Sequence, residues 1–110
     1  IIAYGHCIAH GIDMAHGLDQ EDMAVKCGHW LLYRYNPELL QQGKNPLQLD
    51  SKEPSIPLAQ YAYSENRYRT LIAKDPERAK WLIEEGQKDC NRRWNLYRQL
   101  AGMDYSKAAD

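Results

Sequence analysis

The sequence lacks several features that would assign it to a class of protein at once. Its 110 residues contain no apolar run of about 18 residues, which excludes a transmembrane helix. An excess of one charge is missing too, because 14 Lys and Arg are balanced by 15 Asp and Glu. This balance gives no electrostatic reason to expect a nucleic acid or an anionic membrane as a partner. Cysteines are few, odd in number and far apart, which argues against a disulfide framework and is compatible with a reducing cytosol.

Phosphate-binding loops are also missing, because neither G-x-G-x-x-G nor G-x4-G-K-[ST] occurs.

The first four residues, Ile1-Ile2-Ala3-Tyr4, contain no initiator methionine and no targeting pattern. They are typical of a buried strand that is already under way. We therefore expect this chain to be a piece of a longer protein. Its 44% of hydrophobic residues is enough for a folded core.

Residues 1–37 predict a strand, a helix and a second strand. The opening apolar run ends at Gly5 and does not alternate with polar residues, as in a strand covered on both faces of a parallel sheet. Asp19 is the predicted N-cap of the helix, and Gly28 is its predicted stop. The aromatic stretch 29–35 predicts the second strand. The order favours a right-handed crossover unit, and therefore the α/β fold class.

The rest of the chain predicts an extended loop over 38–57, helices over 58–102 and a frayed tail over 103–110. The proline-rich loop contains one piece, 47–50, that resembles an edge strand. For the last helix, Asp75 is the predicted N-cap, Pro76 the first residue and Gly102 the stop. The apolar positions predicted to face inward are Tyr61, Tyr68, Leu71, Ile72, Ala79, Leu82, Ile83, Gly86, Cys90, Trp94, Tyr97 and Ala101.

Cys7 is the main candidate for a functional residue. It follows the first predicted strand at its carboxyl end, where open α/β sheets place ligands and cofactors. The alternative is a small buried hydrophobe, which is the commoner state of a free cysteine. A [4Fe-4S] cluster needs four thiolates, usually including a C-x2-C pair. Because Cys7, Cys27 and Cys90 lie 20 and 63 residues apart, the chain holds no complete cluster, and Cys27 and Cys90 are predicted to be structural.

Other polar side chains permit weaker hypotheses. A zinc site would use His6, Cys7, His10 and His16, although no second paired motif completes it. A nucleophile and base formed by Cys7 and His10 would lack a third, orienting group. The carboxylates Asp13, Asp19, Glu21 and Asp22 are placed as for helix capping and solvent exposure. Arg34, between two tyrosines, is a candidate for a partly buried anchor.

Six strings taken together carry a family resemblance. They are IIAYGHCIAHGID (1–13), GHWLLYRYNP (28–37), GKNPLQLDSKEPSIPL (43–58), RYRTL (67–71), DPERA (75–79) and NRRW (91–94). In this order and spacing they resemble the carboxyl-terminal end of pyruvate:ferredoxin (flavodoxin) oxidoreductases. The resemblance covers essentially the whole chain. Leu31 departs from a frequent proline, and Cys27 from a small residue such as serine.

The resemblance implies a large cytoplasmic enzyme, commonly a homodimer, with the fold of a thiamine diphosphate-binding domain in this segment. Such enzymes decarboxylate pyruvate oxidatively on thiamine diphosphate and Mg²⁺ and transfer the acetyl group to coenzyme A. Electrons pass through [4Fe-4S] clusters to ferredoxin or flavodoxin. In the motif Y-x-x-C-I-x-H-G, matched by residues 4–11, the cysteine is one ligand of the cluster nearest the thiamine. That residue is Cys7 here.

The family's three other cluster ligands, and its thiamine and Mg²⁺ ligands, lie upstream of the matched segment. The resemblance thus implies that this chain alone holds no cofactor and is inactive. Two alternatives stay open. One is a non-catalytic interaction module, in which the last helix and the segment 30–35 dock on a partner protein. The other is the small zinc-binding domain.

Overall fold

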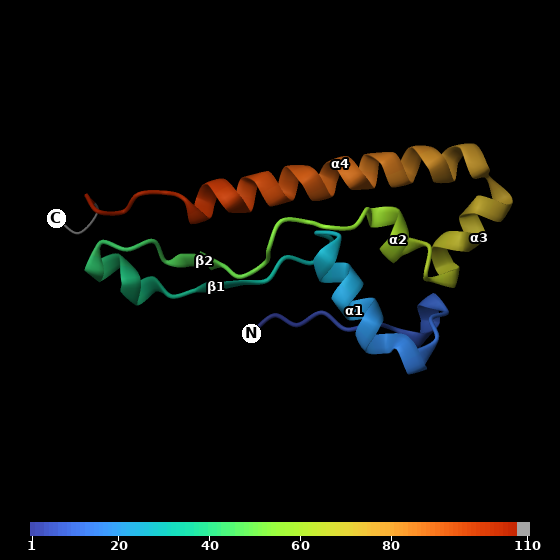
Figure 1. Ribbon diagram of the computed structural model, residues 1–110, viewed down its shortest axis with the longest axis horizontal. Coiled ribbons are helices and arrows are strands. Elements are labelled where there is room, and N and C mark those ends of the chain that lie inside the picture. Colours follow the sequence, from blue (N-terminus) through green and yellow to red (C-terminus); the bar gives the residue numbers. More distant parts are fainter. Residues whose placement is uncertain (108–110) are drawn as a thin grey trace.

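The computed structural model describes residues 1–107 and shows a mixed α/β chain. Its longer helices are α1 (Gly17–Lys26), α2 (Leu58–Ala62), α3 (Asn66–Lys74) and α4 (Pro76–Ala101). Its strands are β1 (Tyr33–Tyr35) and β2 (Leu47–Leu49), and three 3-10 helices are η1 (Ile8–His10), η2 (Met14–His16) and η3 (Pro37–Gln42). In Figure 1, α4 runs along one side of the molecule, and the N-terminal segment lies on the other side.

Helix α4 has the caps that the sequence predicts. The Asp75 carboxylate accepts a hydrogen bond from the backbone N–H of Arg78 at 3.0 Å, and Pro76 is the first helical residue. The helix extends over 26 residues and ends before Gly102. The side-chain amide of Asn45 donates to the carbonyl of Leu100 at 2.8 Å, which satisfies one of the carbonyls left free at a helix end. Of the predicted tail, residues 108–110 lie outside the described residues.

The strands form an antiparallel hairpin, in which Tyr33 pairs with Leu49 and Tyr35 with Leu47. β2 confirms the predicted edge strand. The predicted parallel crossover is wrong for the described residues, because residues 1–4 form no strand and β1 pairs only with the antiparallel β2. η3 and Gly43, at φ 65°, return the chain directly beside β1. The predicted strand 29–35 is therefore paired only over its last three residues.

The predicted first strand is also wrong. Residues 1–4 form no strand, and Ile1 and Ile2 are exposed. A strand requires a neighbour for its backbone hydrogen bonds, and none runs beside this segment within residues 1–107. Asp19 is not the N-cap of α1 but lies in its first turn, because η2 leads directly into the helix. Asp13 caps η2 instead, by accepting a hydrogen bond from the N–H of Ala15.

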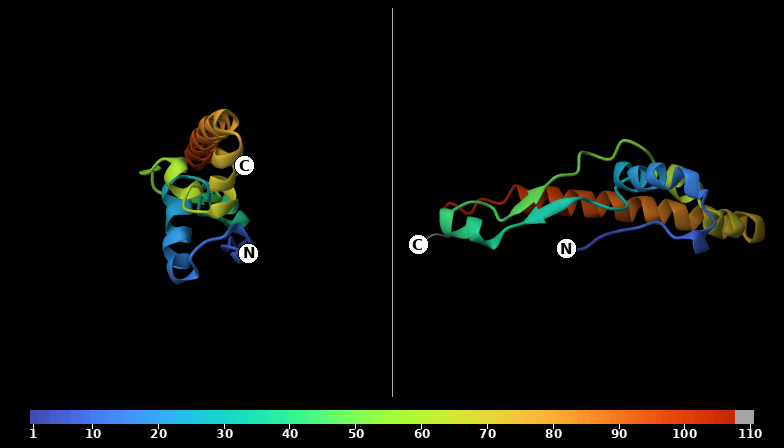
Figure 2. Two further views of the ribbon diagram at one scale, coloured as in Figure 1. Left: turned by 90° about the vertical axis from the view of Figure 1, so that its right-hand side faces the viewer. Right: turned by 90° about the horizontal axis from the view of Figure 1, so that it is seen from below.

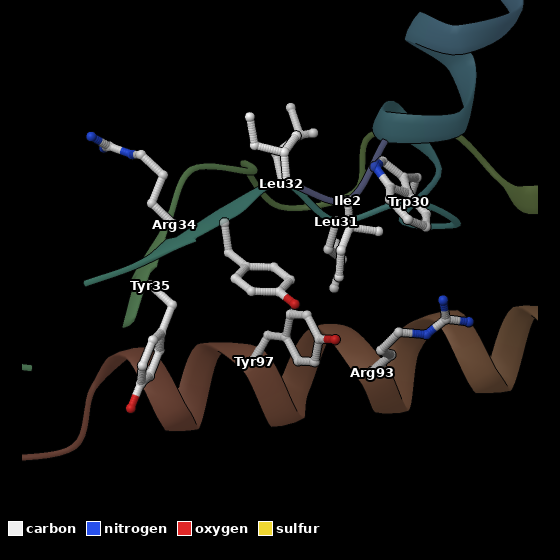
Figure 3. A pocket seen from close by; sticks show the side chains of 10 residues that line it. Ile2, Trp30, Leu31, Leu32, Arg34, Tyr35, Arg93 and Tyr97 are labelled. Atoms are coloured by element: carbon white, nitrogen blue, oxygen red, sulfur yellow. The ribbon is translucent and has the colours of Figure 1, made fainter. Parts of the chain in front are cut away.

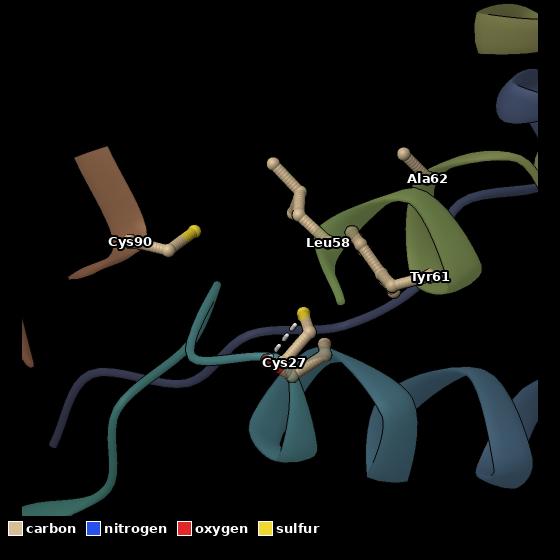
Figure 4. Packing of buried hydrophobic residues seen from close by; sticks show 6 residues of the cluster. Cys27, Leu58, Tyr61, Ala62 and Cys90 are labelled. Atoms are coloured by element: carbon tan, nitrogen blue, oxygen red, sulfur yellow. Dashed lines mark hydrogen bonds between the residues drawn. The ribbon is translucent and has the colours of Figure 1, made fainter. Parts of the chain in front are cut away.

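The core lies where α1, α2 and α4 meet. Its buried residues are Ala24, Cys27, Leu58, Tyr61, Ala62 and Cys90 (Figure 4). The predicted inward positions Tyr61, Ala79 and Cys90 are buried. Tyr68, Ile72 and Leu82, however, are 38–40% exposed. The spacing of apolar residues predicts which side chains share a helix face, but it does not predict whether another element covers that face.

The molecule is elongated and has more surface than a single domain of its size. Figure 2 shows the elongated shape from two further sides. The extents are 58 × 29 × 19 Å, and the radius of gyration is 17.4 Å. A compact domain of this length has a radius of gyration of about 13 Å. The accessible surface is 7901 Å², compared with about 6,300 Å² for a globular monomer of 12.8 kDa. The accessible surface thus exceeds that of a globular monomer by about 1,600 Å².

Both long sides of the molecule expose apolar side chains. The outer side of α4 carries ion pairs between neighbouring turns, Glu85 with Lys88 and Asp89 with Arg92, and α4 also exposes Trp81 and Leu96. The N-terminal region exposes apolar side chains as well. These are Ile1, Ile2, Ile8, Met14 and Leu18, which we call the N-terminal apolar surface. Among residues 1–107, no helix has the length and apolarity needed to cross a membrane.

Candidate functional site

Cys7 stands at the start of η1 and is exposed. Its backbone is extended, with φ −131° and ψ 131°, and its carbonyl accepts a hydrogen bond from the N–H of His10 at 3.0 Å. The Cys7 side chain does not cap η1, and the thiol is free. The leading N–H groups of a helix have no acceptor within that helix. Those of Ile8 and Ala9 belong to the two residues that follow this accessible thiol in the sequence.

The turn that carries Cys7 is held against the start of α3. The backbone N–H of Asn66 donates to the carbonyl of Gly11 at 3.2 Å. Gly11 has φ +69°, and a Cβ at this residue would lie 2.7 Å from the Cβ of Asn66. Only glycine suits both the left-handed backbone and the close approach.

His10 is bonded to a buried carboxylate. Its Nδ1 lies 2.8 Å from Oε2 of Glu65, a residue that is only 1% exposed. The other carboxylate oxygen of Glu65 accepts from the side-chain amide of Gln20 at 2.9 Å. Nη1 of Arg67 lies 3.4 Å from Nε2 of His10. Because arginine can only donate, Nε2 accepts, and Nδ1 carries the proton that is donated to Glu65.

The other two histidines of the predicted zinc set have different partners. Nδ1 of His6 lies 3.0 Å from the Glu21 carboxylate, and His16 pairs with Asp19 at 3.1 Å. The His6 ring also packs on Gly17, where a Cβ would come within 2.6 Å of it. Within residues 1–107, no three His, Cys, Asp or Glu side chains lie close enough to hold a metal ion. The predicted set of four zinc ligands is not brought together, because separate carboxylates hold its imidazoles.

An aromatic cluster fixes the residues just before Cys7. The hydroxyls of Tyr4 and Tyr61 are hydrogen-bonded, and the Tyr4 ring stacks on Trp30 with ring centres 5.4 Å apart. His29 stacks on Tyr61 at 4.9 Å. Burial is the main cause that raises the pKa of Tyr61, so its hydroxyl stays protonated. The sequence predicts Tyr61 as an inward residue but gives no signal for its pairing with Tyr4, 57 residues away.

An apolar groove of about 680 Å³ lies between the segment 30–35 and α4 (Figure 3). Its lining includes Ile2, Trp30, Leu31, Tyr35, Arg93 and Tyr97, and it does not include Cys7. The predicted anchor Arg34 also borders it, but the Arg34 side chain is 70% exposed and donates to both carboxylate oxygens of Asp50. The prediction of a partly buried arginine is wrong, because Asp50 holds the guanidinium at the surface. This contact lowers the pKa of Asp50.

Cys27 and Cys90 lie in the core, as their predicted structural role requires. Burial raises the pKa of both thiols. The Cys27 thiol donates to the carbonyl of Ala24 at 3.5 Å. Of the predicted capping carboxylates, Asp13 does cap a helix, whereas Glu21 binds His6 and Asp22 pairs with Lys26. Cys7 is thus the exposed thiol among the three.

No protein-family model matches the chain. Over 107 residues, or 97% of its length, it is 50% identical to a pyruvate-flavodoxin oxidoreductase of Trichormus variabilis. It is 43% identical over 101 residues to a pyruvate:ferredoxin oxidoreductase of Moorella thermoacetica. The chain is homologous to a segment of the pyruvate-flavodoxin oxidoreductases. This confirms the family resemblance of its six strings.

The matched segment is a small part of these relatives. The chain spans 9% of the Trichormus protein and covers 9% of the Moorella protein. A more distant relative is a mitochondrial NADP⁺-dependent pyruvate dehydrogenase of Euglena gracilis, 37% identical over 111 residues. The chain covers 6% of that protein. The names of all three contain pyruvate but differ in the electron acceptor.

Proposed function

We propose that this chain is the C-terminal segment of a pyruvate:ferredoxin or flavodoxin oxidoreductase, and that Cys7 is one ligand of a [4Fe-4S] cluster. The segment closes a thiamine diphosphate-binding domain of a cytoplasmic, homodimeric enzyme. That enzyme converts pyruvate and coenzyme A to acetyl-CoA and CO₂ with thiamine diphosphate and Mg²⁺. The observation that carries the proposal is the exposed Cys7 thiol within a chain that matches these oxidoreductases over 97% of its length.

The residues around Cys7 fit a cluster ligand. The thiol has no hydrogen-bond partner within residues 1–107, and it stands outside the core that holds Cys27 and Cys90. Hydrogen bonds from backbone N–H groups to cluster sulfurs, together with burial, set the potential of such a centre. The N–H groups of Ile8 and Ala9 are suitable donors. A bound [4Fe-4S] cluster supplies one-electron transfer, and Cys7 holds it against this turn.

The surface character agrees with a segment that packs on the rest of a longer protein. Cys7 adjoins Ile8 of the N-terminal apolar surface. The excess surface of about 1,600 Å² on this chain alone is about twice the roughly 800 Å² that one partner buries in a standard stable interface. The parent chain would therefore cover the N-terminal apolar surface and supply the three remaining thiolates there.

The segment serves a step that is shared by enzymes with different acceptors. The relatives are named for flavodoxin, ferredoxin and NADP⁺, yet each contains a segment similar to this chain. A role in holding a cluster near the thiamine would suit all of them, because such a cluster would supply a one-electron carrier whichever acceptor follows. Ferredoxin or flavodoxin is the acceptor that we propose for the parent enzyme.

The ligand role is tested by Cys7→Ala in the full-length enzyme. We expect the variant to lose about four iron atoms per chain and the low-temperature electron paramagnetic resonance (EPR) signal of one reduced cluster. Reduction of the electron acceptor should fall with them. Cys90→Ala is the matched control, because it also removes a thiol but changes only the core. Unchanged iron and an unchanged signal in Cys7→Ala would show that Cys7 is not a ligand.

A further inference from the structure

The buried Glu65 carboxylate lies at the junction of η1, α1 and α3. It accepts hydrogen bonds from His10 of η1 and from Gln20 of α1, and Glu65 itself precedes α3. Gln20 is 3% exposed, and its side-chain oxygen accepts from the Ser64 hydroxyl at 2.5 Å. Both oxygens of the carboxylate are thus used by buried or half-buried donors.

Glu65 is the N-cap residue of α3, with φ −99° and ψ 131°, but its side chain makes no capping hydrogen bond. Glutamate is not among the residues that favour an N-cap position. The Glu65 carboxylate is buried and bonds to His10 and Gln20. Because burial of a carboxylate is costly, these contacts must compensate for it.

These contacts fix the turn from Cys7 to Gly11. His10 is bonded through its side chain to Glu65 and through its backbone N–H to the Cys7 carbonyl. The next residue, Gly11, accepts from the N–H of Asn66. Adjacent residues of the turn are therefore tied to adjacent residues at the start of α3.

We infer that Glu65 is a positioning residue, which acts through His10 to fix the place and orientation of the Cys7 thiolate at its cluster. This inference rests on the proposed function, because it needs Cys7 to be a ligand. A loosened turn would change the Fe–S–C geometry at one iron and the approach of N–H groups to sulfur, and both affect the cluster's spectrum and potential.

The test uses the full-length enzyme and the one cluster whose EPR signal disappears in Cys7→Ala. In Glu65→Ala we expect this cluster to stay, with iron content unchanged, but with shifted EPR g values and a shifted reduction potential. Glu65→Gln keeps the side-chain length and one acceptor oxygen, so its shift should be smaller. Ser51→Ala is the matched control, because Ser51 is also buried and its hydroxyl accepts from the N–H of Leu32, outside this turn.

A second variant tests the same turn in case Glu65→Ala does not fold. Gly11→Ala places a Cβ against Asn66 and should move the same turn while leaving Glu65 intact. The inference is overturned if both variants keep the wild-type spectrum and potential while their thermal stability falls. It is also overturned if Ser51→Ala shifts the cluster equally. If Cys7→Ala keeps every cluster, Cys7 is not a ligand and the proposed function fails. If Cys7→Ala loses the cluster but the Glu65 and Gly11 variants change neither its spectrum nor its potential, Cys7 is a ligand and Glu65 has no positioning role.

Discussion

Gly86 offers a sharp test of the packing between α2 and α4. It lies in the interior of α4, and a Cβ at this residue would lie 2.8 Å from Cδ2 of Leu58 in the core. Replacing glycine by alanine in a helix interior gains about 1 kcal/mol, whereas adding a methyl group to a packed core costs about 1–3 kcal/mol. We therefore expect Gly86→Ala to leave stability unchanged or lower it by up to about 2 kcal/mol.

Gly86→Ala should become stabilising when the side chain of Leu58 is removed. Leu58→Ala alone should cost about 2–5 kcal/mol, because Leu58 is only 8% exposed. In the Leu58→Ala background the methyl group of Gly86→Ala has space. The higher helix propensity of alanine should then stabilise the protein by about 1 kcal/mol. The two substitutions should thus be coupled by about 1–3 kcal/mol.

Hydrogen exchange of the α4 amides in the full-length protein measures these free energies of opening. Asn95→Ala, at an exposed position of the same helix, is the matched control and should have the same effect in both backgrounds. If Gly86→Ala stabilises α4 equally with Leu58 and with alanine at position 58, the close packing of the two helices is refuted.

Two further predictions concern titratable groups. Because burial raises the pKa of the Cys27 and Cys90 thiols, iodoacetamide should label Cys7 in the folded protein freed of its cluster and spare the other two. Peptide mass spectrometry checks this, and equal labelling would contradict it. Burial and the Arg93 charge lower the pKa of His29, so stability should fall as pH drops below the ordinary 6.5 toward the depressed value. Arg93→Met should reduce this pH-dependent loss in a hydrogen-exchange series, and an unchanged pH slope would contradict it.

The elements that depend on local chemistry could be predicted from the sequence. The bounds of α4 follow from Asp75, Pro76 and Gly102, because caps act within one turn of the helix. The unpaired state of residues 1–4 could not be predicted in this way. Apolar residues such as Ile1 and Ile2 indicate a covered segment, but a strand exists only where a neighbour takes up its hydrogen bonds.

The candidate site was only partly visible in the sequence. The motif of residues 4–11 indicates Cys7, and the exposure of Cys7 fits the ligand role that we propose. The prediction that Cys7 stands at the carboxyl end of a strand is wrong, because residues 1–4 form no strand. Glu65 was missed, because it stands in an ordinary polar stretch before a helix and its partners His10 and Gln20 lie 55 and 45 residues away. The prediction of clustered zinc ligands failed for a related reason. Nearness in sequence does not show which carboxylate each histidine will bind.

The N-terminal apolar surface has a consequence for how this segment changes during evolution. In a free-standing domain, exposed residues such as Ile8 and Leu18 would be the first to be replaced by polar ones, since nothing packs on them. If a longer chain covers them, such replacements carry the same cost as in a core. We expect these positions to keep their apolar character among relatives, while charged residues of α4 such as Lys88 and Arg92 exchange freely. Substitution rates along the segment would then distinguish its covered side from the side that faces solvent.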